Sequence, residues 1–463
     1  MAPAHSRMQD HEKDYERSQK KLEIARMEAS RRTGYDSKST RALLSSEFTR
    51  ITGGLSAYTW QIDTAEALLL GLDCSVIAGT GAGKTMPFVM PLFIEKEKRV
   101  IIISPLNALE EDQAERFNDM GLCAVAVNGE SWNNEIQNRI ANNQYRIIIT
   151  SPDMALEHDP FRSLLSNPKL AQKTLSVIVD EAHCISQWGD KFRPIYQRLG
   201  TLRAFVPAKV PFLATSATMQ PLVLAEIRKV LHINPIDSFH LNMGTDRPNI
   251  AWFVHRMKAA KSDLNALNFA LRRDLASSEI TELVQTMIFF DDINVSMDAM
   301  KHLRACLPPR LRGQIVVYHS RRSSNSKRRV LEEFRSGKIK VLLTTEAAGM
   351  GCDLPSVQRV IQFMVPKSLA IWLQRAGRAA RSCHICGEAF LLVQPTVFQE
   401  KRSKESDNAD IVMFRKDVEP GLRLWIETSG CRREVTAEYF NDGLTRSGNN
   451  HLFAMYSSLL TCS

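Results

Sequence analysis

The stretch Val76–Thr85, VIAGTGAGKT, constrains this 463-residue chain more than any other. An apolar run typical of a buried strand leads into a glycine-rich turn, and Lys84 and Thr85 follow where a helix should begin. Glycine is needed in such a turn because backbone N–H groups wrap a phosphate chain only where no Cβ blocks their approach. The stretch therefore predicts a phosphate-binding loop, in which Lys84 contacts the β and γ phosphates and the Thr85 hydroxyl binds Mg²⁺.

The loop matches the pattern GxxxxGK[ST] with one substitution, because Ala78 occupies the position of the first glycine. A glycine–lysine pair alone would also suit an ordinary strand-to-helix turn. The residues predicted to surround the phosphates are Ala78, Gly79, Thr80, Gly81, Ala82, Gly83, Lys84 and Thr85. Upstream, an amphipathic helix carries Gln61, whose amide is able to donate to and accept from an adenine edge. A surface glutamine is the alternative on spacing alone.

Five further apolar, β-branched runs follow the loop, and helical segments separate them. Short, continuously apolar strands of this kind indicate a parallel sheet that helices cover on both faces. The loops after the strands should then lie along one edge, where ligands bind in open α/β sheets. The runs are Val100–Ser104, Leu122–Val127, Arg146–Thr150, Leu175–Val179 and Val210–Ala214.

Two acids, Asp180 and Glu181, stand directly after the fourth of these runs. Adjacent acids at the end of a buried strand are uncommon without a cation to justify them. We expect Asp180 to hold the Mg²⁺ shell and Glu181 to orient or deprotonate the attacking water. Ser216–Thr218 ends the next strand with small hydroxyl residues that suit coupling of the acids to a neighbouring domain.

The set AGTGAGKT, DEAH and SAT, in this order, resembles the first motor domain of a superfamily 2 helicase. The segment Cys184–Gly189, together with Phe192–Pro194, resembles the aromatic-rich loop of RecQ-type DNA helicases. The resemblance implies that this loop senses single-stranded DNA through Trp188, Phe192 and Arg193. Aromatic faces stack on unpaired bases for about 1–3 kcal/mol each without reading their sequence. The alternative is that Trp188 and Phe192 are core residues.

The chain departs from the RecQ pattern at two places. Asp190–Lys191 stands where a His-Asp pair is usual, so the polar part of the coupling loop is altered. Ala57–Gln61 stands where Phe-Arg-Pro-x-Gln is usual, and Tyr58 would stack on adenine in place of the arginine. Two strand-end loops also match family loops that contact the DNA backbone, and such contacts position the nucleic acid without reading bases. Their residues are Ser104, Pro105 and Ser151.

The resemblance continues beyond Asp246–Ile250, which is similar to the DRPN link that opens the second motor domain. Strand-like runs follow and indicate a second parallel α/β unit; they are Met287–Phe290, Gln314–Tyr318 and Lys340–Leu343. The loops after them carry His319 and Thr345, which the family pattern assigns to nucleic acid. Thr344–Asp353 resembles the ATxAFGMGxD segment, with Ala348 in place of the usual Phe, and implies a nucleotide contact at Asp353.

Gln374–Arg381 matches the QxxGRxxR motif. Arginines at i and i+3 share one helix face, so we expect Arg378 and Arg381 to reach the γ-phosphate, and the resemblance adds Gln374 to the catalytic set. Arginine suits this role because it stays charged and forks to phosphate oxygens. An arginine supplied in this way can raise the rate about a thousandfold or more.

The C-terminal segment is similar to only part of a RecQ protein. Cys431–Arg433 resembles the start of the zinc-binding subdomain, but the clustered cysteines that should follow are absent and only Cys462 remains. Cys383–Cys386 looks like half a zinc site with no second half. We therefore expect no structural zinc. A winged-helix module that many RecQ enzymes use to pry the duplex is not recognised either.

Composition adds weak constraints. The net charge of +9 has the sign of a phosphate-backbone binder, and single-stranded and partly duplex DNA are the expected partners. Nine scattered cysteines do not form a disulfide framework. No run of about eighteen apolar residues exists, so we expect no membrane span. The N-terminus carries no apolar signal core, and we expect an intracellular, nuclear protein that is not secreted.

The expected fold is α/β, with two tandem RecA-like parallel-sheet motor domains and a small, mainly helical C-terminal extension. The predicted parts are a charged N-terminal arm (1–38), expected to be a solvated helix or disordered, the two motor domains (39–245 and 246–398), and the extension (399–463). The resemblance implies an ATP-dependent DNA helicase that moves 3′ to 5′, with ATP and Mg²⁺ between the lobes. The alternatives are a DNA-stimulated ATPase that does not unwind, a non-catalytic decayed copy, and an RNA helicase.

Overall fold

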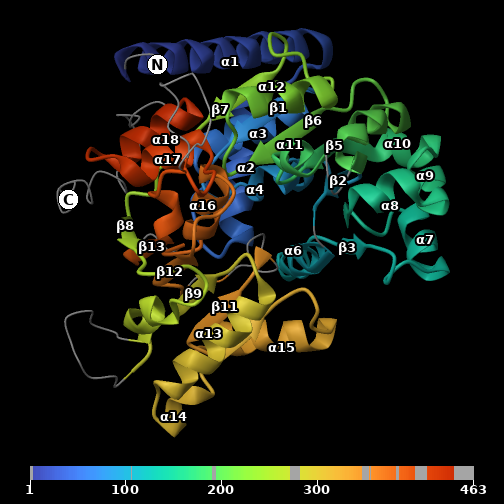
Figure 1. The fold of residues 1–463 in the computed structure, drawn as a ribbon. Helices are drawn as coiled ribbons and strands as arrows, with labels where there is room; N and C mark the ends of the chain where they lie inside the picture. The colour runs from blue at the N-terminus through green and yellow to red at the C-terminus, as the bar shows by residue number, and fades with distance from the viewer. Residues whose placement is uncertain are drawn as a thin grey trace. The chain divides into compact units, whose positions relative to one another are not determined.

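The structure is a computed structural model of residues 1–463. It describes residues 4–105, 107–189, 194–271, 282–346, 354, 356–381, 385–401 and 414–442. These residues form two compact units. The first contains the chain up to Thr245 and the end of the last helix from Ala437, and the second contains Asp246–Thr436. Figure 1 colours the chain from the N-terminus to the C-terminus.

A seven-stranded parallel sheet forms the centre of the first unit, in the order β3-β4-β2-β5-β6-β1-β7. The predicted parallel sheet is confirmed, because β-branched residues fill its central strands and are buried on both faces. Its last strand, β7, was not predicted. The strands are β1 (Cys74–Ile77), β2 (Arg99–Ile103), β3 (Ala124–Val127), β4 (Ile147–Thr150), β5 (Thr174–Val179), β6 (Phe212–Ser216) and β7 (Phe239–Asn242).

Helices connect these strands and cover the sheet (Figure 1). Proline occupies one of the first two positions in several of them, where its missing N–H costs no hydrogen bond. They are α1 (Ala4–Thr33), α2 (Ser37–Ile51), α3 (Thr59–Leu69), α4 (Met86–Val89), α5 (Pro91–Ile94), α6 (Asn107–Asp119), α7 (Asn134–Ala141), α8 (Pro152–Glu157), α9 (Asp159–Leu165), α10 (Pro168–Lys173), α11 (Cys184–Gly189), α12 (Pro221–Val230) and the 3-10 helix η1 (Pro194–Phe205).

The N-terminal segment differs from the expected solvated arm. Helix α1 packs beside the edge strand β7, and Leu22 on its inner face is fully buried in the core of the first unit. The Ser18 hydroxyl accepts a hydrogen bond of 3.0 Å from the His240 main-chain N–H. This bond satisfies a donor that an edge strand would otherwise leave open. For the described part of 1–38, the expected helix is found and the disordered arm is not, but the inner face of this helix is packed against the first unit and not solvated.

The second unit contains a six-stranded parallel sheet in the order β10-β11-β9-β12-β13-β8. The strands are β8 (Ile250–Arg256), β9 (Thr286–Phe289), β10 (Ile315–Tyr318), β11 (Val341–Thr344), β12 (Arg359–Phe363) and β13 (Gly387–Val393). The helices are α13 (Ile293–Ala305), α14 (Pro309–Arg312), α15 (Ser324–Arg335), α16 (Leu369–Ala376), α17 (Pro420–Glu427) and α18 (Arg432–Phe440), with 3-10 helices η2 (Leu264–Leu271) and η4 (Pro395–Val397). The predicted fold class, with two such sheets, is confirmed.

Aromatic packing attaches α17 to the second unit. Trp425 lies edge to face against Trp252 of β8 and Trp372 of α16, with ring centroids 5.8 and 5.9 Å apart. In the Cys431–Arg433 segment, the Arg433 guanidinium donates to the Ile250 carbonyl at 2.8 Å and pairs with Asp246. Arg433 therefore has a structural role that requires no metal, because it binds the first residues of the second unit.

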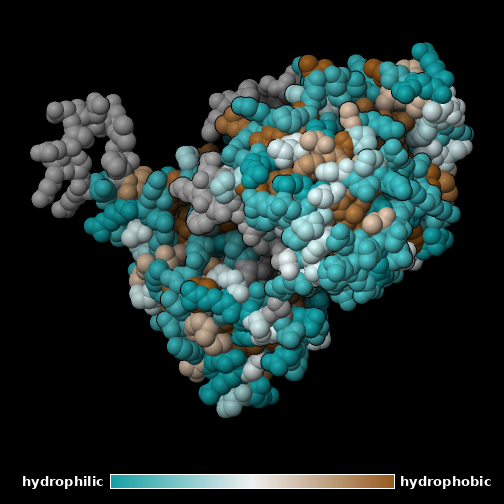
Figure 2. Space-filling model, turned by 90° about the vertical axis from the view of Figure 1, so that its right-hand side faces the viewer, coloured by the Kyte–Doolittle hydropathy of each residue, from teal (hydrophilic) through white to brown (hydrophobic). Residues whose placement is uncertain are grey.

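The outer surface is mixed. On the face in Figure 2, hydrophilic residues predominate and hydrophobic residues are interspersed among them. Within the described part of the chain, no helix combines the length and the apolar character that crossing a membrane requires.

Candidate functional site

The motif loops of the first unit converge because of the strand order. Strands β5, β6 and β1 are neighbours in the sheet and all run in the same direction. The phosphate loop follows β1, Asp180 follows β5, and Ser216 ends β6. The carboxyl ends of parallel strands share one edge, so these three segments meet there, as the sequence predicted.

The phosphate loop is shaped by two glycines in the left-handed region, Gly81 (φ 86°) and Gly83 (φ 82°). Ala78 needs no glycine, because it continues the strand direction: its N–H donates to the Ser216 carbonyl at 3.2 Å and its side chain is buried. The Lys84 ammonium lies 3.5 Å from the Gly79 carbonyl, and Thr85 directly precedes the short helix α4 without a capping hydrogen bond from its side chain. The substitution at Ala78 therefore leaves the rest of the loop pattern intact.

Gln61 on α3 contacts the phosphate loop directly. Its amide nitrogen donates to the Gly83 carbonyl at 3.0 Å, and its amide oxygen accepts from the Tyr58 N–H at 2.9 Å. A Cβ at Gly83 would approach the same amide nitrogen to 2.6 Å, so the glycine is required by the glutamine as well as by its φ. Gln61 is buried, which is not the behaviour of a surface glutamine, and Tyr58 is exposed.

The two acids differ in their surroundings. Asp180 is buried and accepts from the Gln113 amide at 3.0 Å and from the Glu181 N–H at 2.9 Å. Burial, with the neighbouring Glu181 charge added, raises the pKa of Asp180 to about 6. A divalent cation would relieve both effects. Glu181 has a left-handed backbone, at φ 49°, and residues other than glycine rarely adopt it outside functional sites.

His183 connects the acids to the following strand. Its Nδ1 lies 2.7 Å from the Ser216 hydroxyl and 3.3 Å from a Glu181 carboxylate oxygen. Burial opposes protonation of His183, but the adjacent Cys184 and the Glu181 carboxylate raise its pKa. Ser216 also accepts from the Thr218 N–H at 3.3 Å. His183 therefore links Glu181 to the end of β6.

The donor set at this edge fits Mg²⁺. The ion prefers few protein ligands, keeps several waters, and is bound by one or two carboxylates together with substrate phosphates. A buried Asp180 and the Thr85 hydroxyl beside a phosphate loop supply that set. Within the described ranges, no group of three or more His, Cys, Asp or Glu side chains is arranged to hold a metal. Cys383, His384 and Cys462 lie outside those ranges.

The predicted nucleic-acid residues stand in different situations. Ser104 is buried and its hydroxyl has no hydrogen-bond partner among the described residues, whereas the Ser151 hydroxyl caps α8 by accepting from the Met154 N–H at 3.1 Å. Pro105 is buried. In the second unit, burial and the charges of Arg322 and Arg321 lower the pKa of His319.

The remaining predicted contacts are described in part or not at all. Thr345 follows β11, and its carbonyl accepts from the Thr344 hydroxyl at 2.9 Å. Trp188 lies in α11, but its side chain is outside the description, as are Phe192, Arg193 and Asp353.

Helix α16 ends at Ala376, so it contains only the first three residues of the QxxGRxxR segment, Gln374–Ala376. Arg378 and Arg381 lie in the turn and the irregular chain that follow, and the expectation that they share a helix face is therefore wrong. Gln374 and Arg378 are buried, and Arg381 is half-buried. Arg247 holds this end: its guanidinium donates to the carbonyls of Gly377 at 3.1 Å and Ala380 at 2.6 Å. Burial and the nearby Arg381 charge lower the pKa of Arg247 to about 10.

Three residues of the site were not predicted as functional: Gln113, Arg247 and Arg375. Arg375 donates to Asp291 at 2.8 Å and Gln362 at 2.7 Å, and it also bonds Glu346. Arg247 and Arg375 lie in recognised segments, the link and the QxxGRxxR motif, but the motif leaves the position of Arg375 unspecified. The partners of Arg247 are main-chain carbonyls about 130 residues later, which no local pattern reveals.

Comparison with known proteins supports the same division. Residues 58–227 match the DEAD/DEAH box helicase family, and residues 270–383 match the helicase conserved C-terminal domain. The fold resembles the helicase MrfA bound to DNA and AMPPNP, with a TM-score of 0.59 and 20% identity, covering 76% of this chain and 50% of that one. The fold and the two family matches together make the chain similar to DEAD/DEAH box helicases.

Sequence relatives narrow that class. The chain is 28% identical over 397 residues to the ATP-dependent DNA helicase RecQ of Haemophilus influenzae, covering 84% of this chain and 60% of that protein. It is 26% identical over 392 residues to a putative ATP-dependent RNA helicase, R290, of Acanthamoeba polyphaga mimivirus, covering 82% of this chain and 66% of that protein. The chain is therefore similar over most of its length to RecQ-type helicases of superfamily 2. It spans about two thirds or less of the length of these two relatives.

Proposed function

We propose that the protein is an ATP-dependent DNA helicase or translocase of RecQ type, which couples ATP hydrolysis to 3′ to 5′ movement on single-stranded DNA. The observation that carries the proposal is the convergence of three loops at one sheet edge. There the phosphate loop after β1, the Asp180 loop after β5 and Ser216 of β6 meet on adjacent parallel strands.

In the first unit, each residue has a chemical task that its surroundings permit. Lys84 binds the β and γ phosphates, and loop N–H groups freed by Gly81 and Gly83 surround them. Glu181 orients or deprotonates the attacking water. Mg²⁺ held by Thr85 and Asp180 would neutralise the charge that develops on the phosphates. Gln61 selects adenine while it holds the loop through the Gly83 carbonyl.

In the second unit, Arg378 and Arg381 are the candidates for the γ-phosphate, supported by Gln374. Their helix end is fixed by the contacts of Arg247 with the carbonyls of Gly377 and Ala380. A buried arginine stays charged and keeps a fixed geometry, which suits stabilisation of transition-state charge. Asp353 is retained as a nucleotide contact on the family pattern alone.

Contacts with DNA are proposed from the resemblance. Ser104, Pro105 and Ser151 would meet the backbone from the first unit, and His319 and Thr345 from the second. The buried Ser104 hydroxyl, which has no hydrogen-bond partner in the described ranges, supports this assignment, because a buried hydroxyl normally finds one. Trp188, Phe192 and Arg193 would sense the single strand.

The decisive test is steady-state ATP hydrolysis with and without a single-stranded oligonucleotide. We expect DNA to stimulate turnover severalfold, and Lys84→Ala to abolish it. Glu181→Gln should bind ATP but hydrolyse it at least a hundredfold more slowly, since it loses the group that prepares the water. A wild-type protein without DNA-stimulated turnover would contradict the proposal and favour a non-catalytic binding protein.

The same assays distinguish two alternatives: a preference for RNA over DNA, and translocation without unwinding. The relative named as a putative RNA helicase makes RNA a specific alternative, so DNA and RNA strands of one sequence should be compared as stimulators. Strand displacement on a duplex with a 3′ overhang distinguishes unwinding from translocation alone. Hydrolysis without displacement would identify an ATPase that remodels or translocates. A 5′ overhang substrate tests the polarity.

A nuclear location is proposed from the relationship to eukaryotic RecQ proteins and from exposed basic pairs such as Arg31–Arg32 on α1. Fluorescence microscopy of the tagged full chain in a eukaryotic cell tests it, with Arg31 and Arg32 changed to Gln as the comparison. Exclusion of the wild-type protein from the nucleus would contradict it.

A further inference from the structure

Helix α3 is buried on opposite faces for different reasons. On one face, Gln61 reaches the carbonyl of Gly83 in the phosphate loop. On the other, Asp63 and Glu66 lie three residues apart, so their carboxylates share a helix face. Acidic side chains are seldom fully buried unless they are paired. Two on one helix face therefore need an explanation that the nucleotide site does not give.

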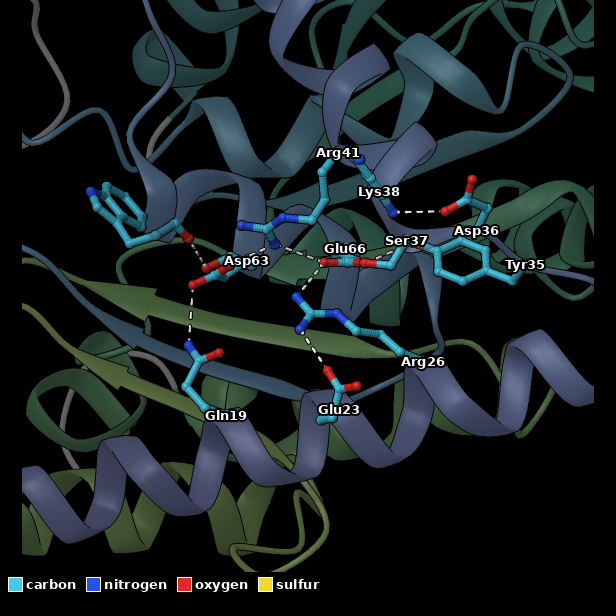
Figure 3. A network of polar contacts seen from close by, with 12 residues as sticks. Gln19, Glu23, Arg26, Tyr35, Asp36, Ser37, Lys38, Arg41, Asp63 and Glu66 are labelled. Atoms are coloured by element: carbon cyan, nitrogen blue, oxygen red, sulfur yellow. Dashed lines mark hydrogen bonds and ion pairs between the residues drawn. The ribbon is translucent and has the colours of Figure 1, made fainter.

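The explanation is a network that three helices build around these acids (Figure 3). Arg26 of α1 donates to Glu66 at 2.7 Å, and Arg41 of α2 donates to Glu66 at 2.8 Å and to Asp63 at 2.7 Å. Gln19 of α1 adds a bond of 3.1 Å to Asp63.

Hydroxyl groups complete the shell of Glu66. Tyr35 donates to it at 3.1 Å, and Ser37 donates to the same carboxylate oxygen. Burial alone would raise the pKa of Glu66, but the bonds from Arg26, Ser37 and Arg41 lower it, so the carboxylate stays charged. In Figure 3 the two guanidinium groups approach Glu66 from different helices and enclose it. The network therefore fixes α3 against α1 and α2 in one arrangement.

One apolar core continues from these helices to the phosphate loop. It includes Leu22 of α1, Phe48 of α2, Trp60 of α3 and Val76 of β1, and Ala82 of the loop packs against it. Close-packed interiors transmit displacements because neighbouring side chains have no free volume to absorb them. A shift of α3 would therefore move Gln61, whose amide meets the loop.

We propose that α1 and the Asp63–Glu66 network are a positioning element of the nucleotide site, which holds Gln61 in register with the phosphate loop and so sets ATP affinity and base preference. The inference rests on the proposed function only as far as nucleotide binding. Arg26, Arg41, Asp63 and Glu66 are positioning residues, because they act through α3 and touch no loop residue in the contacts above. Helix α1 would then influence ATP from a segment that precedes every recognised motif.

The test compares two variants on α1. Arg26→Gln removes a charge that reaches Glu66, whereas Lys21→Gln removes a charge paired with Asp237, 2.8 Å away, with no contact to α3. Equilibrium binding of a fluorescent ATP analogue, with ATP and GTP as competitors, is measured for both variants and for the wild-type full chain. We expect Arg26→Gln to weaken ATP binding about tenfold and to reduce the preference for ATP over GTP. Lys21→Gln should change neither.

Two further variants keep the test informative if Arg26→Gln does not fold. Gln19→Ala removes only the neutral bond to Asp63 and should weaken ATP binding two- to threefold. Arg26→Lys keeps the charge and should recover most of the affinity.

Variants that unfold at lower urea but keep the wild-type affinity and ATP preference would overturn the inference and leave α1 a purely structural helix. Because binding is measured without turnover, absence of DNA-stimulated hydrolysis would contradict the proposed function without touching this result.

Discussion

Each unit contains a network around a buried charge, and the two central charges have opposite signs. In the first unit the centre is the Glu66 carboxylate, which Arg26 and Arg41 enclose. In the second it is the Arg375 guanidinium, which Asp291 and Glu346 contact. Both networks join one central charge to two opposite charges. Comparing them therefore separates the effect of solvent exposure on stability from the effect of the sign of the central charge.

The two networks differ in the solvent exposure of the residues that surround the central charge. The Glu66 side chain is 0% exposed, and those of Arg26 and Arg41 are 19% and 27% exposed. The Arg375 side chain is 5% exposed, but those of Asp291 and Glu346 are 48% and 43% exposed. Water screens a pair whose partners are half exposed. The Glu66 network therefore holds three helices together, while the Arg375 network is a local connection between strand-end loops and α16.

The largest effect should come from Glu66→Leu. The variant leaves two largely buried guanidinium groups without their shared carboxylate, and breaking a buried pair costs about 3–5 kcal/mol. Urea unfolding followed by circular dichroism measures the loss. Glu23→Gln is the matched control, because Glu23 also bonds Arg26 but is 58% exposed, and it should cost less than about 1 kcal/mol. Equal losses for the two variants would show that burial does not govern the network.

Arg375→Met should have a smaller effect on stability. The carboxylates it abandons are half exposed and can be hydrated, so we expect a loss of about 1–3 kcal/mol, from the buried polar contacts. Lys338→Met, which removes an exposed ion pair with Glu333 at 2.7 Å, is the control and should cost less than about 1 kcal/mol. If Arg375→Met destabilises more than Glu66→Leu, the contrast between the centres is wrong.

The two networks should also differ in how they respond when the acid and the arginine of one ion pair are exchanged. Arg375→Glu combined with Glu346→Arg places the new pair where water tolerates imperfect geometry, so the double variant should regain part of the loss. A coupling free energy of about 1–2 kcal/mol in a double-mutant cycle is expected. The corresponding exchange of Glu66 and Arg26 should regain nothing, since Arg41 would then face a second guanidinium. Recovery of both exchanges would remove the distinction between them.

Much of the fold followed from the sequence because its central strands are continuous apolar runs. Strand β12 was not predicted, since Arg359 and Gln362 interrupt its apolar pattern. Both are buried in the folded chain: Arg359 pairs with Glu388 at 2.8 Å, and Gln362 bonds Arg375. The buried face of helix α1 was missed for a related reason. Its charges dominate the composition and hide a narrow face that includes Tyr15, Ser18 and Leu22.

The motif residues could be located from the sequence because their spacing carries the chemistry locally. Lys84, Asp180 and Ser216 meet at one edge for a reason that parallel topology makes general. Their supporting residues could not be located in this way. Arg26 and Glu66 are 40 positions apart, and Arg375 and Asp291 are 84 apart. Only the folded chain shows which buried charge meets which partner.

The smallest expected effect is a pH dependence of stability, which tests whether the negative charge of Glu66 itself contributes. The folded-state pKa of Glu66 lies below its ordinary value of 4.5, so its charge contributes stability that is present above that value and lost as pH falls through the folded pKa. Glu66→Gln keeps the shape but not the charge and should cost about 1 kcal/mol at neutral pH. The gap from the wild type should close as the wild-type carboxylate is protonated. Urea unfolding from pH 7 downward measures the gap, and a gap that stays constant would mean that Glu66 acts through shape and hydrogen bonding alone.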